Sequence, residues 1–242
     1  MARAKAKLML PAGHSLLFES IRIMRMHLRQ LFPVAAIGTT LSLIFKNNEV
    51  LASLWFVFLS CALIWSIRHL EDPKVKITIR NAYYQGTAPV LRFILTLLML
   101  SVASIPLSIG LLLYRSLIGI TINGFMQAEF ILISVVSLLL AVLSFYLLVR
   151  MLYALVIITL PDMIPLQAVR ISWRLSQGKT MRLLRIWLIF VLYAAFVAGL
   201  LLVLITLSNQ PLLRGYLFDF VIGLLIIPLF YTFMFISYKK LA

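Results

Sequence analysis

Six long apolar segments alternate with short polar ones along the chain. A helix that crosses a bilayer needs roughly 20 mostly apolar residues, so the pattern predicts six spanning helices. In chain order they are Leu31–Phe45, Val50–Ile67, Val90–Tyr114, Glu129–Arg150, Ile186–Leu207 and Tyr216–Tyr238. The first is the shortest, and it reaches spanning length if the preceding helix continues into it. The fourth apolar run continues past Arg150 to Leu160, and we expect this extension to lie along the membrane interface.

Three of the intervening segments combine basic residues with apolar residues at helical spacing, which predicts amphipathic helices on one membrane face. They cover residues 17–31, Pro73–Gly86 and Pro165–Gly178. Their apolar stripes are Leu17, Ile21, Met24, Leu28 and Leu31; Val75, Ile79 and Ala82 or Tyr83; and Leu166, Val169 and Trp173. The alternation over Val75–Arg80 also fits a strand, but a lone strand would have no partner in an all-helical protein. We therefore expect a helix there.

Two stretches of the chain resemble each other. A shift of 92 residues places Pro73, Gln85 and Gly86 on Pro165, Gln177 and Gly178. This match suggests an internal repeat of residues 73–114 in residues 165–207. With the N-terminal helix, the chain becomes three units that each consist of a surface helix followed by two spans.

Composition agrees with lipid as the solvent. The 242 residues are 63% hydrophobic and only 12% charged, with a mean hydropathy of +1.08. Soluble domains are about 45–50% apolar and about 25% charged, so a soluble enzyme, a nucleic-acid-binding module and a disordered protein are disfavoured. The single cysteine, Cys61, excludes an intrachain disulfide. The early apolar run Leu8–Leu10 is shorter than the core of a signal peptide, and we expect no cleaved signal.

The net charge of +15 is distributed unevenly. Of the 22 Lys and Arg residues, all but Lys46, Arg115 and Arg214 fall on one side of the predicted spans. The positive-inside rule assigns that side, and both termini, to the cytoplasm. The acidic residues are divided between the two sides. Those on the outer side balance the three basic residues there, so the inner side carries the whole net charge. The sequence thus predicts a multi-pass membrane protein with both termini in the cytoplasm.

A sequence signature spans the end of the fourth segment and the helix that follows it. An apolar run ends at Asp162, and the next helix carries Ala168, Ser172, Leu175 and Gly178. This pattern resembles a family of six-span bacterial inner-membrane proteins, akin to the membrane domain of glycerophosphoryl diester phosphodiesterases. The resemblance implies a membrane domain without the soluble catalytic barrel. No catalytic residue of that enzyme can be transferred to this chain.

No constellation typical of catalysis or of cofactor binding is apparent in the sequence, and we expect no cofactor and no metal. His14, His27 and His69 are far apart and lack ligands at metal-binding spacing. Glu129 and Asp219 lie near the outer side, where Arg115 and Arg214 are the expected ion-pair partners. Arg150 fits either an interfacial anchor or a functional charge that lines a cavity.

Stripes of small residues on three spans predict close packing of helices, with a hydrophilic groove as the alternative. The stripes are Ser101, Ser104 and Ser108; Ser134, Ser137, Ala141 and Ser144; and Ala195 and Gly199.

The basic inner surface contains the candidate contact residues. Three explanations stay open, namely control of topology with headgroup contact, specific binding of anionic lipid, and docking of an acidic cytoplasmic protein. Nucleic acid is not expected as a partner. The candidate contacts are Arg22, Arg25, Arg29, Arg170, Arg174, Lys179, Arg182 and Arg185.

These observations predict an all-α, polytopic fold with six transmembrane helices and three amphipathic helices on the cytoplasmic face. The whole chain is expected to form one membrane domain, comprising a basic N-terminal segment (residues 1–30) and a six-span bundle (residues 31–242). The predicted role is non-enzymatic, in envelope or lipid organisation or as the subunit of a complex. A permease, or the membrane subunit of a transporter, is the alternative, and an intramembrane lipid enzyme is the third choice.

Overall fold

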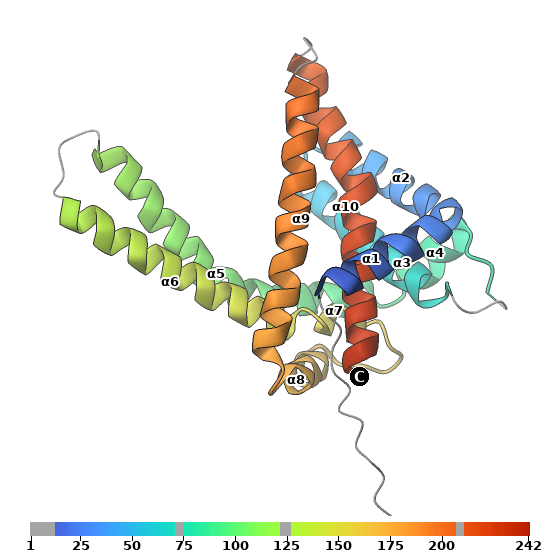
Figure 1. Cartoon of the computed structure of the whole chain (residues 1–242). Helices are drawn as coiled ribbons and strands as arrows, with labels where there is room; N and C mark the ends of the chain where they lie inside the picture. Colours follow the sequence, from blue (N-terminus) through green and yellow to red (C-terminus); the bar gives the residue numbers. More distant parts are fainter. Residues whose placement is uncertain (1–12, 71–74, 122–126, 207–210) are drawn as a thin grey trace, which may run out of the picture. The chain divides into compact units, whose positions relative to one another are not determined.

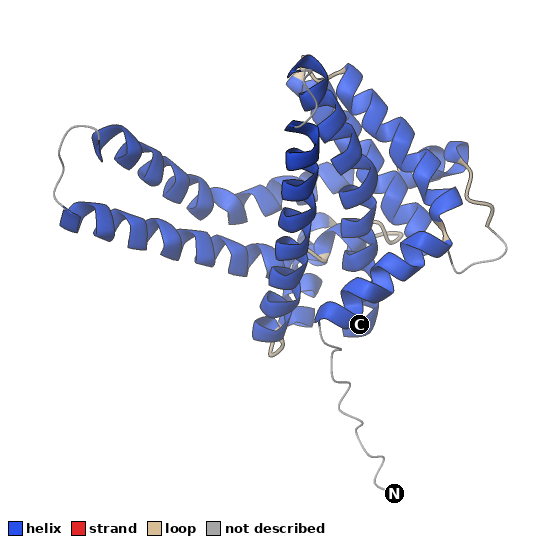
Figure 2. Ribbon diagram, turned by 45° about the horizontal axis from the view of Figure 1, so that its top comes forward, coloured by secondary structure: helices blue, strands red, loops and turns tan. Residues whose placement is uncertain are grey.

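The computed structural model describes residues 13–70, 75–121, 127–206 and 211–242, and all regular structure in these ranges is helical (Figure 2). Ten helices follow one another along the described chain (Figure 1). They are α1 (Gly13–Met26), α2 (Leu28–Ile44), α3 (Glu49–Arg68), α4 (Ile79–Gly86), α5 (Val90–Thr121), α6 (Gln127–Met151), α7 (Ala154–Ile157), α8 (Pro165–Ser176), α9 (Thr180–Thr206) and α10 (Pro211–Leu241).

Each predicted apolar segment forms a helix at close to its expected position. Five helices, α3, α5, α6, α9 and α10, are long and apolar enough to cross a membrane. The chain is therefore a helical protein with multiple membrane-spanning helices. The remaining apolar helix, α2, has 17 residues, and α1 does not extend it as one straight helix because the chain turns at His27.

The chain divides into two compact units. One comprises Met1–Val90 and Met181–Ala242, and the other comprises Leu91–Thr180. The two copies of the predicted repeat do not follow this division. Each copy begins in one unit and continues in the other.

In the first unit, α2, α3 and α10 pack against one another, α1 packs against α10, and α4 packs against α3. Two hydrogen bonds link these helices across long sequence separations. Tyr231 of α10 donates to Ser60 Oγ of α3 at 2.6 Å, and Tyr83 of α4 donates to the Val34 carbonyl of α2 at 2.9 Å. Burial raises the pKa of Tyr83 to about 12, so its hydroxyl remains a donor at neutral pH.

Aromatic side chains hold α9 against α10. Trp187 and Phe190 of α9 contact Phe230 and Phe233 of α10, with ring centroids 4.8–5.8 Å apart. Edge-to-face and offset ring pairs add to the stabilisation from burial alone. These ring contacts join α9 to the first unit.

In the second unit, α5 and α6 form an antiparallel pair that runs side by side in both views (Figures 1 and 2). Ser144 of α6 donates to the Ala103 carbonyl of α5 at 2.7 Å. A Cβ added to Gly110 would lie 3.0 Å from the Ser137 carbonyl oxygen. The predicted packing role is thus confirmed for Ser137 and Ser144 of the α6 stripe.

A side chain of α8 caps the C-terminal end of α6. The last carbonyls of a helix lack partners within it, and Ser172 Oγ donates to the carbonyl oxygen of Arg150 at 2.7 Å. The four residues of α7 are buried and pack beside α8. As expected, the fourth apolar helix ends near Arg150, and the apolar run continues as this short helix.

The buried face of α8 consists of small residues. Ala168, Ser172 and Ser176 are fully buried, whereas Leu166 of the apolar stripe is 56% exposed and Val169 and Trp173 are half-buried. Small side chains let helix backbones approach closely, while large apolar side chains lose nothing by facing lipid. The amphipathic placement of this helix on a membrane face stays a prediction.

The predicted N-terminal amphipathic helix is interrupted. Residues 17–31 do not form one continuous helix, since the chain turns at His27 between α1 and α2. Of the predicted stripe, Leu17 and Leu31 are buried, Ile21 and Met24 are half-buried, and Leu28 is exposed. Pro33 removes a backbone donor from the first turns of α2, which weakens the helix close to this turn.

The second short helix is shorter than predicted. Residues 75–78 are not helical, α4 begins at Ile79, and its buried residues are Ala82 and Gly86. No strand forms over the described residues 75–80. The repeat aligns Gly86 with Gly178, but the two glycines differ, because Gly86 packs on α3 whereas Gly178 has a positive φ of 73°.

The sequence of residues 115–128, between the third and fourth predicted spans, also allows a re-entrant segment. Residues 115–121 continue α5, and residues 122–126 lie outside the described part of the chain. On α9, Ala195 and Gly199 are exposed, and a Cβ at Gly199 would meet no atom within 4 Å. That stripe does not pack against the described residues.

Gly86→Ala is expected to destabilise the protein, because its Cβ would lie 2.9 Å from the Ala62 Cα, a backbone atom that cannot rotate away. Overpacking of this kind costs about 1–3 kcal/mol. The control is Gly199→Ala, which has open space and should be neutral or more stable by up to about 1 kcal/mol. Chemical unfolding of the full chain in detergent, followed by circular dichroism, measures both. Equal effects of the two substitutions would contradict the close approach of α4 and α3.

Candidate functional site

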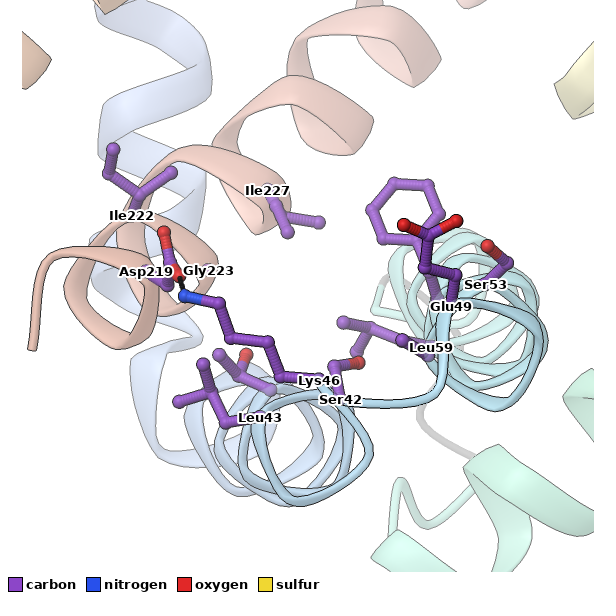
Figure 3. Close-up of a pocket in the computed structure, with 13 residues that line it drawn as sticks. Ser42, Leu43, Lys46, Glu49, Ser53, Leu59, Asp219, Ile222, Gly223 and Ile227 are labelled. Carbon is purple, nitrogen blue, oxygen red and sulfur yellow. Dashed lines mark hydrogen bonds and ion pairs between the residues drawn. The ribbon is translucent and has the colours of Figure 1, made fainter. Parts of the chain in front are cut away.

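A pocket of about 490 Å³ lies among α2, α3 and α10 in the first unit (Figure 3). Ligand sites commonly have volumes of about 300–1,000 Å³, so this pocket is large enough for a small molecule or for part of a lipid. Its lining residues are Thr39, Ser42, Leu43, Lys46, Glu49, Ala52, Ser53, Phe56, Leu59, Asp219, Ile222, Gly223 and Ile227. We call it the α2–α3–α10 pocket.

A tight turn between α2 and α3 builds one end of the pocket. The sequence Lys46-Asn47-Asn48-Glu49 was expected as a polar turn, and α2 ends before it at Ile44. Asn48 caps α3, because its side chain accepts a hydrogen bond from the Leu51 backbone N–H at 3.2 Å. Glu49 then occupies the first turn of α3, where the helix dipole favours a negative charge. The turn thereby places the Lys46 ammonium just after the end of α2 and the Glu49 carboxylate at the start of α3.

Lys46 and Asp219 form an ion pair across the mouth of the pocket (Figure 3). The Lys46 ammonium also lies 5.1 Å from the centroid of the Tyr216 ring. The bond to Asp219 raises the pKa of Lys46, so the ammonium keeps its charge at neutral pH and loses it as the pH rises through the raised lysine pKa. Both side chains are partly exposed, at 45% and 42%, and water therefore weakens their attraction.

This pairing corrects the sequence prediction for Asp219. Arg115 and Arg214 were its expected partners, but its partner in the structure is Lys46, 173 residues away in the sequence. No local pattern could have indicated that contact. The side chain of Glu129, the other acid of that prediction, lies outside the described residues.

The pocket changes from polar to apolar along its depth. Asp219 and Ile227 are eight residues apart on α10, which corresponds to about 12 Å along a helix axis. Lys46, Glu49 and Asp219 lie at one end, whereas Phe56, Leu59 and Ile227 form the apolar part. In Figure 3, Ile227 and Leu59 point into the space between the three helices. An amphipathic molecule matches this gradient.

The hydroxyl groups that line the pocket are largely occupied by helix carbonyls. Thr39 donates to the Ala35 carbonyl at 2.7 Å, and Ser42 donates to the Gly38 carbonyl at 2.9 Å. Such bonds back to the preceding helical turn satisfy a hydroxyl locally. The pocket therefore offers a ligand one ion pair, the Glu49 carboxylate and an apolar wall.

The eight predicted basic contacts do not line this pocket, and seven of them occupy exposed helix surfaces. Arg22 and Arg25 lie on α1, and Arg29 lies in the first turn of α2. Arg182 and Arg185 lie in the first two turns of α9. In the second unit, Arg170 and Arg174 are one turn apart on α8, and Lys179 is half-buried in the turn that follows. The structure thus places them on several helices rather than around one cavity.

Within the described residues, no three His, Cys, Asp or Glu side chains gather at metal-binding distance. Cys61 is fully buried in α3, and His69 bonds through Nδ1 to the Trp65 carbonyl oxygen at 2.8 Å. These side chains are part of the packing of α3 in this structure.

No family model, curated protein or solved structure matches the chain. The geometry of the described residues is therefore the basis for the functional proposals below.

The ion pair should contribute little to the free energy of unfolding, and this contribution should require opposite charges at positions 46 and 219. Lys46→Asp and Asp219→Lys are each expected to lower the unfolding free energy only slightly, as for other exposed pairs. The double variant, which restores opposite charges, should recover most of that loss at low salt. Chemical unfolding in detergent measures all three variants. Additive losses in the double variant would show that the two side chains do not interact.

Proposed function

We propose that this chain is a non-enzymatic, multi-pass membrane protein that binds a lipid in the α2–α3–α10 pocket and so serves lipid or envelope organisation. The observation that carries the proposal is the gradient of the pocket, from an interfacial ion pair to an apolar wall. A lipid has the same gradient, from a polar headgroup to acyl chains. The pocket also lies in a bundle whose outer surface carries many exposed large apolar residues, which suits entry from the bilayer.

We further propose that α2 is the sixth span. Its 17 residues would reach about 25 Å along a helix axis, slightly less than the hydrocarbon thickness of about 30 Å. It packs against α3 and α10, which are both long enough to span. Arg29, exposed in its first turn, can extend toward the headgroups and so compensate for the missing length.

This topology places Lys46 and the pocket mouth on the outer side, with both termini in the cytoplasm of a bacterial cell. The three short helices α1, α4 and α8 would then lie on the inner side, where anionic headgroups attract basic residues. The family of six-span inner-membrane proteins, akin to the phosphodiesterase membrane domain, is the relationship we propose for the chain.

Reporter fusions test the topology. A periplasmic reporter fused after residue 47 should be active, and the same reporter fused after residue 70, 165 or 242 should be inactive, because a six-span chain returns to the cytoplasm at those points. A cytoplasmic reporter at the same four positions serves as the reciprocal control. Periplasmic activity after residue 70 or 165 would exclude the proposed arrangement.

Filling the pocket tests lipid binding. Ala52→Trp places a large ring in the pocket lining and is expected to lower the amount of co-purified lipid at least fivefold in a mild detergent. The matched control is Ala195→Trp on the exposed face of α9, which should retain the wild-type amount. Mass spectrometry of extracted lipids, normalised to folded protein, gives the measurement.

The outcome of this experiment also separates the alternatives. Equal lipid retention in both variants would refute the pocket as a lipid site. Release of a water-soluble solute from the wild type, but not from Ala52→Trp, would instead support the permease alternative. Co-purification of an ATPase would support a transporter subunit.

A further inference from the structure

Arg150 is a buried cation in the second unit. It lies in the last turn of α6, and only 9% of its surface is exposed. Burying a charge is costly unless a counter-charge and hydrogen bonds compensate for the lost water. The surroundings of its guanidinium group therefore need an explanation.

Neutral groups hold the Arg150 side chain in place. Nη1 donates to the Tyr146 hydroxyl at 2.9 Å, and Nε donates to Ser176 Oγ at 3.4 Å. The guanidinium carbon lies 3.8 Å from the centroid of the Trp173 ring and 5.5 Å from that of the Tyr146 ring. Aromatic faces attract a cation, and a planar guanidinium can stack on them. These contacts fix the plane of the group without neutralising its charge.

The positive charge has no acidic partner in the described part of the second unit. Asp162 is the one carboxylate described there; it is exposed in the turn before α8 and pairs with no basic side chain among the described residues. Arg150 has five N–H donors, of which the Tyr146 and Ser176 bonds use two. A fixed cation with spare donors is the usual equipment for recognising a planar or tetrahedral oxyanion.

We propose that Arg150, oriented by Tyr146, Trp173 and Ser176, binds a phosphate-type oxyanion. The anion would accept hydrogen bonds from the guanidinium N–H groups that these residues leave free, and its charge would compensate that of the buried cation. It is either the headgroup phosphate of an anionic phospholipid or free phosphate, since the two share this chemistry. The site lies in a different unit from the α2–α3–α10 pocket and does not depend on the function proposed for that pocket.

Titration of the full-length, detergent-solubilised protein tests the site. The probes are a short-chain phosphatidylglycerol, a diacylglycerol of the same chain length without phosphate, and inorganic phosphate. Arg150→Gln should weaken binding of the phosphate-bearing probe at least tenfold. The control Arg92→Gln removes the same charge from an exposed position on α5 of the same unit, and it should change affinity by no more than about twofold.

The probes separate the two sources of phosphate. Binding of phosphatidylglycerol with no competition from inorganic phosphate identifies a lipid headgroup, whereas effective competition identifies a site for the free ion as well. The binding of diacylglycerol should not depend on Arg150 in either case. Wild-type affinity in Arg150→Gln, or an equal loss in Arg92→Gln, would overturn the proposal.

A second variant guards against a purely structural effect. Arg150→Lys keeps the positive charge but lacks the planar fork, and it should retain the wild-type helix content while binding phosphate at least threefold more weakly. Circular dichroism and thermal unfolding of each variant establish that folded protein is being compared. If Arg150→Gln does not fold, the lysine variant decides, and unchanged affinity in it would overturn the proposal.

Discussion

The close approach of helix backbones is the constraint on which the rest of this structure depends. Between helices in lipid, apolar side chains gain little from burial, because the acyl chains are equally apolar, so packing distance becomes decisive. Gly86 lies against the backbone of α3, and Ala168, Ser172 and Ser176 form the buried face of α8. Once backbones are this close, a serine hydroxyl can reach a carbonyl on a neighbouring helix, as Ser172 does at the end of α6.

The sequence was sufficient to predict the helical fold and the positions of its long helices, because length and hydropathy are local properties. It also indicated the polar turn that Asn48 closes by capping α3. Helical spacing alone could not show which face of a short helix packs against the protein, because an apolar side chain can face either lipid or a neighbouring helix. In α8, Leu166 of the apolar stripe is exposed and Ser172 is buried.

The α2–α3–α10 pocket could not be predicted, because its defining contact joins residues from opposite ends of the chain. Lys46 follows the first apolar helix and Asp219 lies in the last, and neither residue has a distinctive neighbour in the sequence. The sequence showed only that each of these two charged residues lies beside or within an apolar segment. Lys46 and Asp219 come together because α2 packs against α10. That packing in turn depends on residues such as Gly223 at the contact between the two helices.

The two units hold a basic side chain in different ways. Lys46 is partly exposed and is neutralised by Asp219, so its charge is already satisfied at the pocket mouth. Arg150 is far more buried, yet it is supported by two hydroxyl groups and two aromatic rings. A purely structural cation gains more from a carboxylate than from neutral supports, because only an opposite charge offsets the cost of burial. Neutral supports orient the guanidinium while preserving its attraction for an anion, which is the arrangement that a binding site requires.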